Sequence, residues 1–302
     1  MRFGLSVANI GEYADARLVA GLARDAEDAG WDGLFVWDHL VFVKAWRPEV
    51  GDAWTILTAV ALATDRLRLG PMVTPIPRRR PQVVARQTTT LDRLSGGRLV
   101  FGAGLGEPAE DEFGSFGEPT DRRTRAAMLD EGLEVLAALW SGEAVTHHGA
   151  HYTVDDVTFL PRPIQVPRIP VWIAATVGHE RPLRRAARWD GVHPVKYGPD
   201  GEDLPLTPED VASMFADVRR FRAEAGLPEA GLAEAGLPGA QPAGAPFDVV
   251  ALGEMDPSDR VGTRHACAEL AAAGATWWLQ AVSPRGGDVE TMRRLVRAGP
   301  PR

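Results

Sequence analysis

Short apolar segments alternate with longer amphipathic segments along the chain. The apolar segments are three to seven residues long, and most lack the polar–apolar alternation of a half-buried strand. A continuous apolar run of this length is typical of a parallel strand that is covered on both faces. Eight such segments predict strands at residues 3–7, 34–37, 67–73, 99–103, 171–174, 191–194, 249–251 and 276–279.

The segments between these strands carry apolar residues at helical spacing. In the first, Leu18, Leu22, Ala26 and Ala29 share one face, and Gly30 ends the helix. The other helices are expected at 54–63, 82–94, around 129–140, 182–189, 207–225, 258–273 and 289–296. Eight strand–helix units in order predict an α/β chain that forms one (β/α)8 TIM barrel over residues 1–302. A doubly wound open sheet is the alternative, but no Gly-x-Gly-x-x-Gly motif follows the first strand.

Two segments depart from this repeat. Residues 144–152 predict a small hairpin around His148-Gly149, and a proline-rich extended connector follows it. At about 224–246 the letters Glu-Ala-Gly-Leu recur with a period of five, interrupted by prolines. Five is the period of neither a helix nor a strand, so we expect a low-complexity surface insertion without chemistry.

Composition and charge narrow the class of protein. The chain has 302 residues, of which 45% are hydrophobic and 25% charged, as in a globular protein. Its net charge of −8, from 33 Lys and Arg against 41 Asp and Glu, disfavours a nucleic-acid partner. No run of about 18 uncharged apolar residues predicts a membrane span, and the single cysteine, Cys267, forms no internal disulfide. We therefore expect a cytoplasmic protein, for which a homodimer is one compatible assembly.

The carboxyl ends of the strands are where a barrel carries its chemistry. Asp38 and His39 follow the second strand; the histidine can transfer a proton near neutral pH, and the carboxylate can orient it or bind a ring. Glu107 follows the fourth strand and is a candidate proton donor. On spacing alone, a structural histidine and a solvated rim carboxylate are equally valid interpretations.

Other strand ends suggest where a ligand could bind. Met72 and Val73 end the third strand, where residues can lie against a planar ligand, and Gly104 belongs to a turn whose glycines allow close approach. Small residues after the fifth strand precede a helix, whose unpaired N–H groups favour a phosphate. These residues are Ala175, Thr176, Val177 and Gly178. Lys196, after the sixth strand, adds a positive charge. A proline-rich rim and an ordinary loop are the alternatives at these places.

Three clusters of polar residues are expected to carry no chemistry. Arg78-Arg79-Arg80 could attract an anionic cofactor tail, but this run and Glu110-Asp111-Glu112 both have the pattern of solvated charged faces. His147, His148 and His151 lack an accompanying set of carboxylates or cysteines. No metal site is therefore predicted.

Several motifs occur together in a recognisable order. They are Trp37-Asp38-His39, Met72-Val73-Thr74-Pro75, Gly104-Leu105-Gly106-Glu107, a helix ending in Leu139-Trp140-Ser141-Gly142, His151-Tyr152, and Val171-Trp172-Ile173-Ala174-Ala175. In this order they resemble the bacterial luciferase-like superfamily of flavin-dependent oxidoreductases, which includes a coenzyme F420-dependent branch. The likeness covers about residues 1–196 and resumes at 274–278.

The resemblance implies a barrel that binds FMN or coenzyme F420 at its mouth and acts on a small organic substrate as an oxidoreductase or monooxygenase. It implies support of the ring near Met72-Val73, in many members through a non-proline cis peptide, and phosphate contacts near residues 175–178. In the F420 branch, the positions of His39 and Glu107 transfer protons, and that of Asp38 contacts the cofactor.

Two positions depart from the F420 pattern. Met72 stands where some F420 enzymes carry a small polar residue, and Thr176-Val177 replaces a double glycine. FMN and F420 therefore both remain open.

Two functions of other classes also remain open. One is a barrel hydrolase in which Glu107 pairs with Asp38 or Glu110, which predicts turnover without a yellow cofactor. The other is a non-catalytic flavin-binding homologue, which predicts binding without turnover.

Overall fold

The computed structural model describes residues 1–200, 202–227, 247–283 and 288–302. All but the first four residues of the insertion expected at 224–246 lie outside these ranges. The main sheet consists of β1 (Arg2–Val7), β2 (Gly33–Val36), β3 (Arg68–Pro71), β4 (Thr74–Pro75), β5 (Phe101–Gly104), β8 (Val171–Thr176), β9 (Gly191–Val195), β10 (Asp248–Gly253) and β11 (Trp277–Val282). The α-helices are α1 (Ala16–Asp28), α2 (Ala53–Ala63), α3 (Pro81–Leu94), α4 (Ala109–Glu112), α5 (Arg122–Trp140), α6 (Glu180–Ala186), α7 (Pro208–Glu224), α8 (Arg260–Ala272) and α9 (Val289–Arg297).

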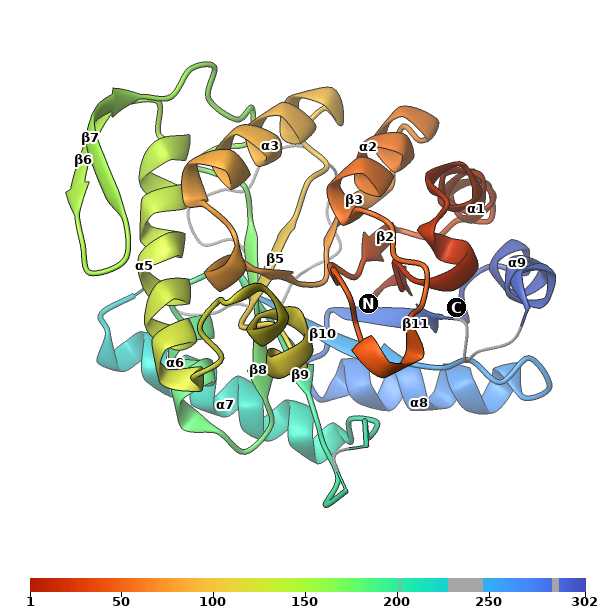
Figure 1. Cartoon of the computed structure of the whole chain (residues 1–302). Coiled ribbons are helices and arrows are strands. Elements are labelled where there is room, and N and C mark those ends of the chain that lie inside the picture. The colour runs from red at the N-terminus through yellow and green to blue at the C-terminus, as the bar shows by residue number, and fades with distance from the viewer. Residues whose placement is uncertain (201, 228–246, 284–287) are drawn as a thin grey trace.

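The strands form a parallel barrel with helices around it (Figure 1). Their order is β3-β2-β1-β11-β10-β9-β8-β5-β4. β3 and β4 are two halves of one strand, interrupted at Met72-Val73. A parallel bridge between Leu69 and Leu99 joins β3 to the segment that leads into β5, and the N–H of Val100 donates to the carbonyl of Leu69 at 2.8 Å. This bridge closes the barrel, which confirms the predicted fold.

Side chains alternate between two cores along each strand, as the two-residue period of a strand requires. Leu5, Leu34 and Ile173 face outward into the layer between strands and helices. The inner cluster is filled by large side chains: Phe35, Met72, Val100, Trp172, Val250, Trp277 and Leu279. The rings of Phe35, Trp172 and Trp277 lie 5.2 to 5.7 Å apart, centroid to centroid. The interior is therefore a packed core rather than a pore, and a ligand has to bind at one end.

The helices begin where the sequence offers a cap. At α7 the Thr207 hydroxyl accepts from the N–H of Asp210, and the Asp210 carboxylate accepts from the N–H of Thr207. This capping box, with Pro208 at the first helical position, confirms the predicted start. Among the described residues, no helix is both long enough and apolar enough to cross a membrane.

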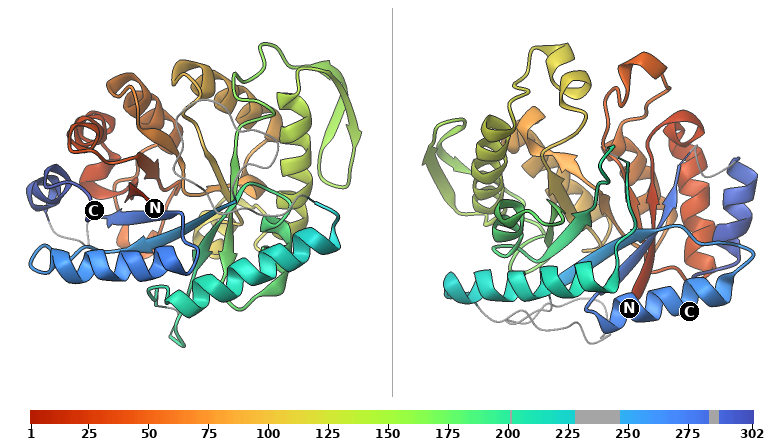
Figure 2. Two further views of the ribbon diagram at one scale, coloured as in Figure 1. Left: turned by 180° about the vertical axis from the view of Figure 1, so that it is seen from behind. Right: turned by 90° about the horizontal axis from the view of Figure 1, so that it is seen from below.

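The predicted hairpin is longer than expected. β6 (Ala144–His148) pairs with β7 (Thr153–Thr158), so the second strand begins where the prediction ended. Neither face of β7 is buried, which explains why it carries no apolar alternation to reveal it. The hairpin lies beside α5, at the outside of the barrel (Figures 1 and 2).

Candidate active site

A buried polar cluster lies where β2 and β4 end. The Asp38 carboxylate accepts a hydrogen bond from the Thr74 hydroxyl at 2.8 Å. Its other oxygen faces Nη2 of Arg78 at 3.0 Å and Nη2 of Arg79 at 2.6 Å. The Asp38 side chain is only 1% exposed, so both of its oxygens have protein partners. That Asp38 contacts a cofactor remains a prediction. Its carboxylate would have to make this contact while it is paired with Arg78 and Arg79.

Glu112 joins this cluster, and the expectation that its acidic run is solvated was wrong for this residue. Its side chain is completely buried and forms an ion pair with Arg78. Its carboxylate also accepts hydrogen bonds from the N–H groups of Leu40, Val41 and Phe42. Glu112 therefore fixes the loop that follows His39. The arginine run was misread in the same way, since the Arg78 side chain is 3% and that of Arg79 16% exposed.

His39 is held by the same carboxylate. Its Nδ1 lies 3.3 Å from Oε1 of Glu112, and its side chain is 19% exposed. A buried carboxylate only accepts, so we assign the hydrogen to Nδ1, which leaves the lone pair on Nε2. The rings of Trp37 and Phe42 flank the imidazole, with centroids at 5.9 and 4.8 Å. His39 thus has the fixed tautomer and the partial access that a proton-transfer group requires.

The charge of Glu112 is strongly stabilised. Burial raises its pKa, but hydrogen bonds from His39 and from the backbone of Leu40 and Phe42, together with the charge of Arg78, outweigh burial and lower the pKa to about 2. Glu112 is therefore ionised at neutral pH. This negative charge lies directly beside the imidazole of His39.

The predicted ring support lies next to this cluster. The peptide bond between Met72 and Val73 is cis, as the resemblance implies. Met72 is buried in the inner core, and Val73 is partly exposed above it. A Cβ at Gly104 would lie 2.5 Å from Cγ2 of Val73, so this glycine makes room for the valine side chain. We expected a ligand to approach the backbone closely at Gly104. In the structure, the side chain of Val73 occupies that place.

Glu107 lies on the loop after β5 and is not joined to His39. Its side chain is 56% exposed, and its Oε1 lies 3.1 Å from Nη2 of the buried Arg125. Arg125 also donates to the carbonyls of Leu105 and Gly106, which anchors the whole loop. The hydrolase alternative pairs Glu107 with Asp38 or Glu110. For the first of these pairs, the structure gives each carboxylate an arginine partner instead.

Glu107 shares its surroundings with Tyr197 and Arg122. Burial raises the pKa of Tyr197, the charges of Asp203 and Glu107 raise it further, and Arg122 lowers it. Tyr197, which follows β9, therefore lies within electrostatic range of the loop after β5 and of the start of α5.

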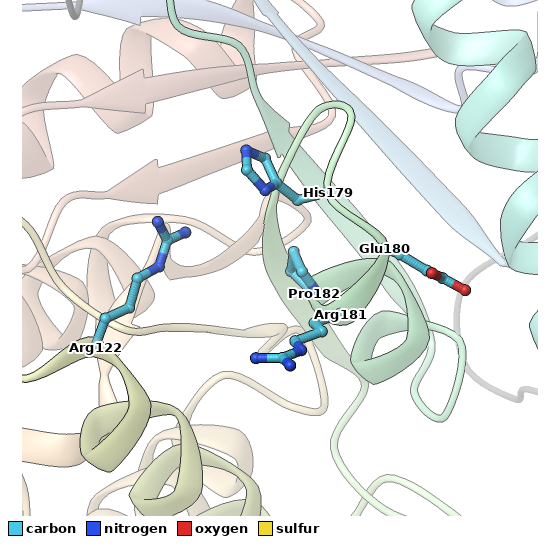
Figure 3. A pocket seen from close by; sticks show the side chains of 5 residues that line it. All are labelled: Arg122, His179, Glu180, Arg181 and Pro182. Carbon is cyan, nitrogen blue, oxygen red and sulfur yellow. The ribbon is translucent and has the colours of Figure 1, made fainter.

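An open pocket of about 480 Å³ lies beside the loop after β8. It is lined by Arg122, His179, Glu180, Arg181 and Pro182. Figure 3 shows the guanidinium of Arg122 directed toward the ring of His179, whereas Glu180 points away. The pocket is thus lined by two guanidinium groups and an imidazole, a donor set suited to an anion.

The residues predicted to bind phosphate border this region, but their backbone is partly committed. The N–H of Val177 donates to Val195 at 2.9 Å, and the N–H of His179 donates to Thr176 at 3.2 Å. Ala175 faces the outer core and is buried. Gly178 has a φ of +78°, and no atom lies within 4 Å of where its Cβ would be. The side chains of the pocket, rather than a row of free N–H groups, supply most of the donors here.

Lys196 has a structural partner. Its Nζ lies 2.6 Å from Oδ2 of Asp210, which forms the capping box of α7 with Thr207. Its predicted contact with phosphate remains a prediction. To make that contact, the ammonium would have to share its charge with Asp210.

The histidines of the hairpin contact a carboxylate that the sequence did not reveal. Glu131 of α5 accepts from the backbone of His151 and Tyr152 and lies 3.2 Å from Nε2 of His147. The contact ties the hairpin to α5. Within the described part of the chain, no three His, Cys, Asp or Glu side chains are grouped closely enough to hold a metal ion.

A comparison of this sequence with known protein families agrees with a barrel that carries these residues at its strand ends. The sequence profile of the luciferase-like monooxygenase family matches residues 1–237. The chain belongs to this family. As a luciferase-like monooxygenase family member, it is 35% identical over 182 residues to the F420-dependent glucose-6-phosphate dehydrogenase of Nakamurella multipartita. The match covers 58% of this chain and 51% of that enzyme, and the chain spans about half the length of the curated relatives that it matches.

Solved structures of the same fold cover nearly the whole luciferase-like chain. An F420-dependent secondary alcohol dehydrogenase in complex with an F420–acetone adduct has a TM-score of 0.75 at 18% identity, over 99% of this chain and 98% of its own. The oxygenating constituent of 3,6-diketocamphane monooxygenase from Pseudomonas putida, in complex with FMN, has a TM-score of 0.68 at 14% identity, over 99% and 96%. At such low identity these likenesses show the fold alone.

Two groups of residues in this luciferase-like site escaped sequence reasoning. Glu112 directly precedes Phe113, which is fully buried, and this neighbour was the one signal that the end of the acidic run turns inward. Arg122 and Arg181 carry no local signal at all. They come together because the start of α5 packs near the start of α6.

Proposed function

We propose that this chain is an oxidoreductase that uses coenzyme F420 and interconverts an alcohol and a carbonyl on a small organic substrate. One observation carries the proposal: His39, at the end of β2, has its tautomer fixed by the buried Glu112 and keeps its other ring nitrogen as a proton acceptor. The names of the F420-dependent relatives support the choice of cofactor and of substrate class.

The residues present fit a cofactor of this kind. A deazaflavin or flavin with a phosphate on its side chain needs an apolar rest for the ring and a basic site for the phosphate. Val73 supplies a partly exposed apolar surface at the mouth, and Arg122, His179 and Arg181 supply the basic site. When bound, F420 would supply the hydride acceptor.

The protein supplies position and a proton acceptor. In the oxidation of an alcohol, the carbon–hydrogen bond breaks and its electron pair leaves as hydride. The C=O double bond forms as the hydroxyl proton passes to Nε2 of His39, and Glu112 stabilises the resulting imidazolium. Trp37 and Phe42 pack against the imidazole that accepts this proton. Glu107, which is exposed and paired with Arg125, is proposed to donate or accept a proton at the opposite side of the mouth.

The test is a titration followed by turnover. The protein is titrated with F420 and FMN, each oxidised and reduced, and fluorescence reports binding. F420 reduction is then measured with a panel of alcohols. Binding of F420 with alcohol-dependent reduction is expected. Binding of FMN alone with oxygen consumption would instead indicate a monooxygenase, and binding without turnover would indicate a non-catalytic homologue.

A matched pair of variants tests the basic pocket. Arg122→Gln should weaken binding of F420 roughly tenfold, since a hydrogen bond to a charged group contributes about 1.5–3 kcal/mol when it is shielded and less when exposed. Arg123 is the next residue of α5 but lies outside the pocket, so Arg123→Gln should leave the affinity for F420 unchanged. A deazaflavin without the phosphate should bind both variants equally. If Arg122→Gln weakens binding of this deazaflavin as much as binding of F420, the pocket does not bind the phosphate.

The proposal includes a small-molecule substrate, no nucleic-acid partner, a cytoplasmic location and a homodimer. Cell fractionation tests the location. Light scattering of the purified protein tests the assembly.

A further inference from the structure

His193 is an inward-facing residue at the top of the barrel core. It follows Val192 on β9, and Val192 belongs to the outer core. Because side chains alternate along a strand, His193 points into the barrel. It pairs in register with Ala174 of β8, and a Cβ at Gly104 of β5 would lie 3.4 Å from the Cβ of Ala174. His193 therefore belongs to the same layer as Gly104 and Ala174.

This layer forms the floor of the mouth. Below it, Phe35, Trp172 and Trp277 are essentially completely buried. Within or beside it, Val73, Ala174 and Leu252 are partly exposed, and Val73 and Leu252 pack on the inner core. Since these side chains are apolar, a ligand that rests on the floor meets a smooth apolar surface. The imidazole of His193 adds a polar group beside this apolar surface.

The imidazole has capacity for a hydrogen bond that the protein leaves unused. His193 is 8% exposed, and its Nδ1 is shielded from solvent without a hydrogen-bond partner. Burial lowers its pKa to about 4, against a smaller opposing effect from a hydrogen bond of the ring to the backbone of Val250. The ring is thus uncharged at neutral pH, with one N–H and one lone pair. A buried polar atom without a partner destabilises the fold, so its presence calls for a reason.

We propose that His193 is a specificity-determining residue whose imidazole hydrogen-bonds to a polar group of the ligand on the floor of the mouth. Because the ring N–H is engaged with the backbone of Val250, the free Nδ1 is an acceptor, and the group is an N–H or O–H carried by the edge of the cofactor ring or by the substrate. The inference rests on the proposed function. It adds a third polar contact, distinct from His39 and from the basic pocket, on the β9 side of the barrel.

The experiment compares three variants with the wild-type protein. His193→Leu removes the polar ring, His193→Gln keeps a hydrogen-bonding group, and Val192→Ala is a control for damage to the same strand. Thermal unfolding is measured without ligand. Fluorescence titration with F420 and the KM for an alcohol substrate then distinguish the two sources of the polar group.

His193→Leu should unfold at the same or a higher temperature than wild type, because it removes an unpartnered buried nitrogen. It should nevertheless bind its ligand about five- to a hundredfold more weakly, since a ligand group loses its partner. His193→Gln should recover part of that loss. Val192→Ala should show the reverse pattern, with lower stability and unchanged affinity.

The two measurements, F420 affinity and KM, distinguish a contact with the cofactor from a contact with the substrate. A loss in F420 affinity assigns the contact to the ring, and a rise in KM at unchanged F420 affinity assigns it to the substrate. If wild type binds F420 and turns over while His193→Leu matches it in both measures, the proposal for His193 is overturned. If wild type binds neither F420 nor FMN, it is the proposed function that fails.

Discussion

Replacing Glu112 with glutamine should destabilise the protein strongly and remove part of its acid sensitivity. Glu112 is completely buried and ionised, and its carboxylate serves Arg78, His39 and three backbone N–H groups. A glutamine of the same shape keeps one acceptor oxygen but loses the charge. It leaves the buried Arg78 with Asp38 as its remaining carboxylate partner.

The magnitude follows from the pKa of Glu112, which is lowered from 4.5 to about 2 in the folded protein. Because each pH unit is worth about 1.4 kcal/mol, the ionised carboxylate contributes roughly 3 kcal/mol to the free energy of unfolding at neutral pH. The folded pKa lies below the unfolded one. The contribution is therefore fully present above about pH 4.5 and is lost as the pH falls to about 2.

The assay is urea unfolding of wild type and Glu112→Gln at pH 7 and at pH 3. The variant should be less stable by about 3 kcal/mol at pH 7, and the difference should shrink at pH 3. Glu110→Gln, on the exposed side of the same short helix, is the control and should change stability by less than about 0.5 kcal/mol. If Glu112→Gln costs no more than the control, or if its cost is the same at both pH values, the reasoning is refuted.

Three further predictions concern the mouth and the core. His39→Ala and Glu107→Gln should each lower turnover by about a hundred- to ten-thousandfold, with a much smaller change in cofactor affinity. If steady-state kinetics give a kcat near that of the wild type for both variants, oxygen chemistry on FMN would be favoured instead. Gly104→Ala should fold but bind cofactor more weakly, because the new Cβ displaces the side chain of Val73; unchanged affinity in a titration would show that Val73 does not support the ring. Cys267 is buried, and burial raises its pKa to about 11, so a thiol reagent should react with it only on the timescale of unfolding.

The barrel could be predicted from the sequence because its strands are buried on both faces. Continuous apolar runs such as 34–37 mark these strands, and Gly30 marks the end of a helix. β7 was missed because both of its faces are polar or exposed, so nothing in its pattern distinguishes it from a loop. The break in the third strand at Met72-Val73 came from the resemblance and not from periodicity.

The site was harder to predict because its geometry depends on contacts between distant residues. Asp38 and His39 could be placed at a strand end, but the side chains that fix them lie 36 to 73 positions away along the chain. Glu110, Asp111 and Glu112 are chemically similar, and they differ in the direction in which their side chains project from a short helix. No local pattern encodes that direction.

The basic pocket also affects how fast an anionic ligand arrives. The chain as a whole carries a charge of −8, whereas the guanidinium groups of Arg122 and Arg181 place two positive charges at the pocket, from which Glu180 points away. At about 0.01 M salt the Debye length is near 30 Å, so an approaching anion is repelled by the whole surface; at about 0.15 M it is near 8 Å, and only the pocket acts on it. Association with a phosphate-bearing ligand should therefore become faster as salt is first added, and slower again only when the attraction of the pocket is itself screened.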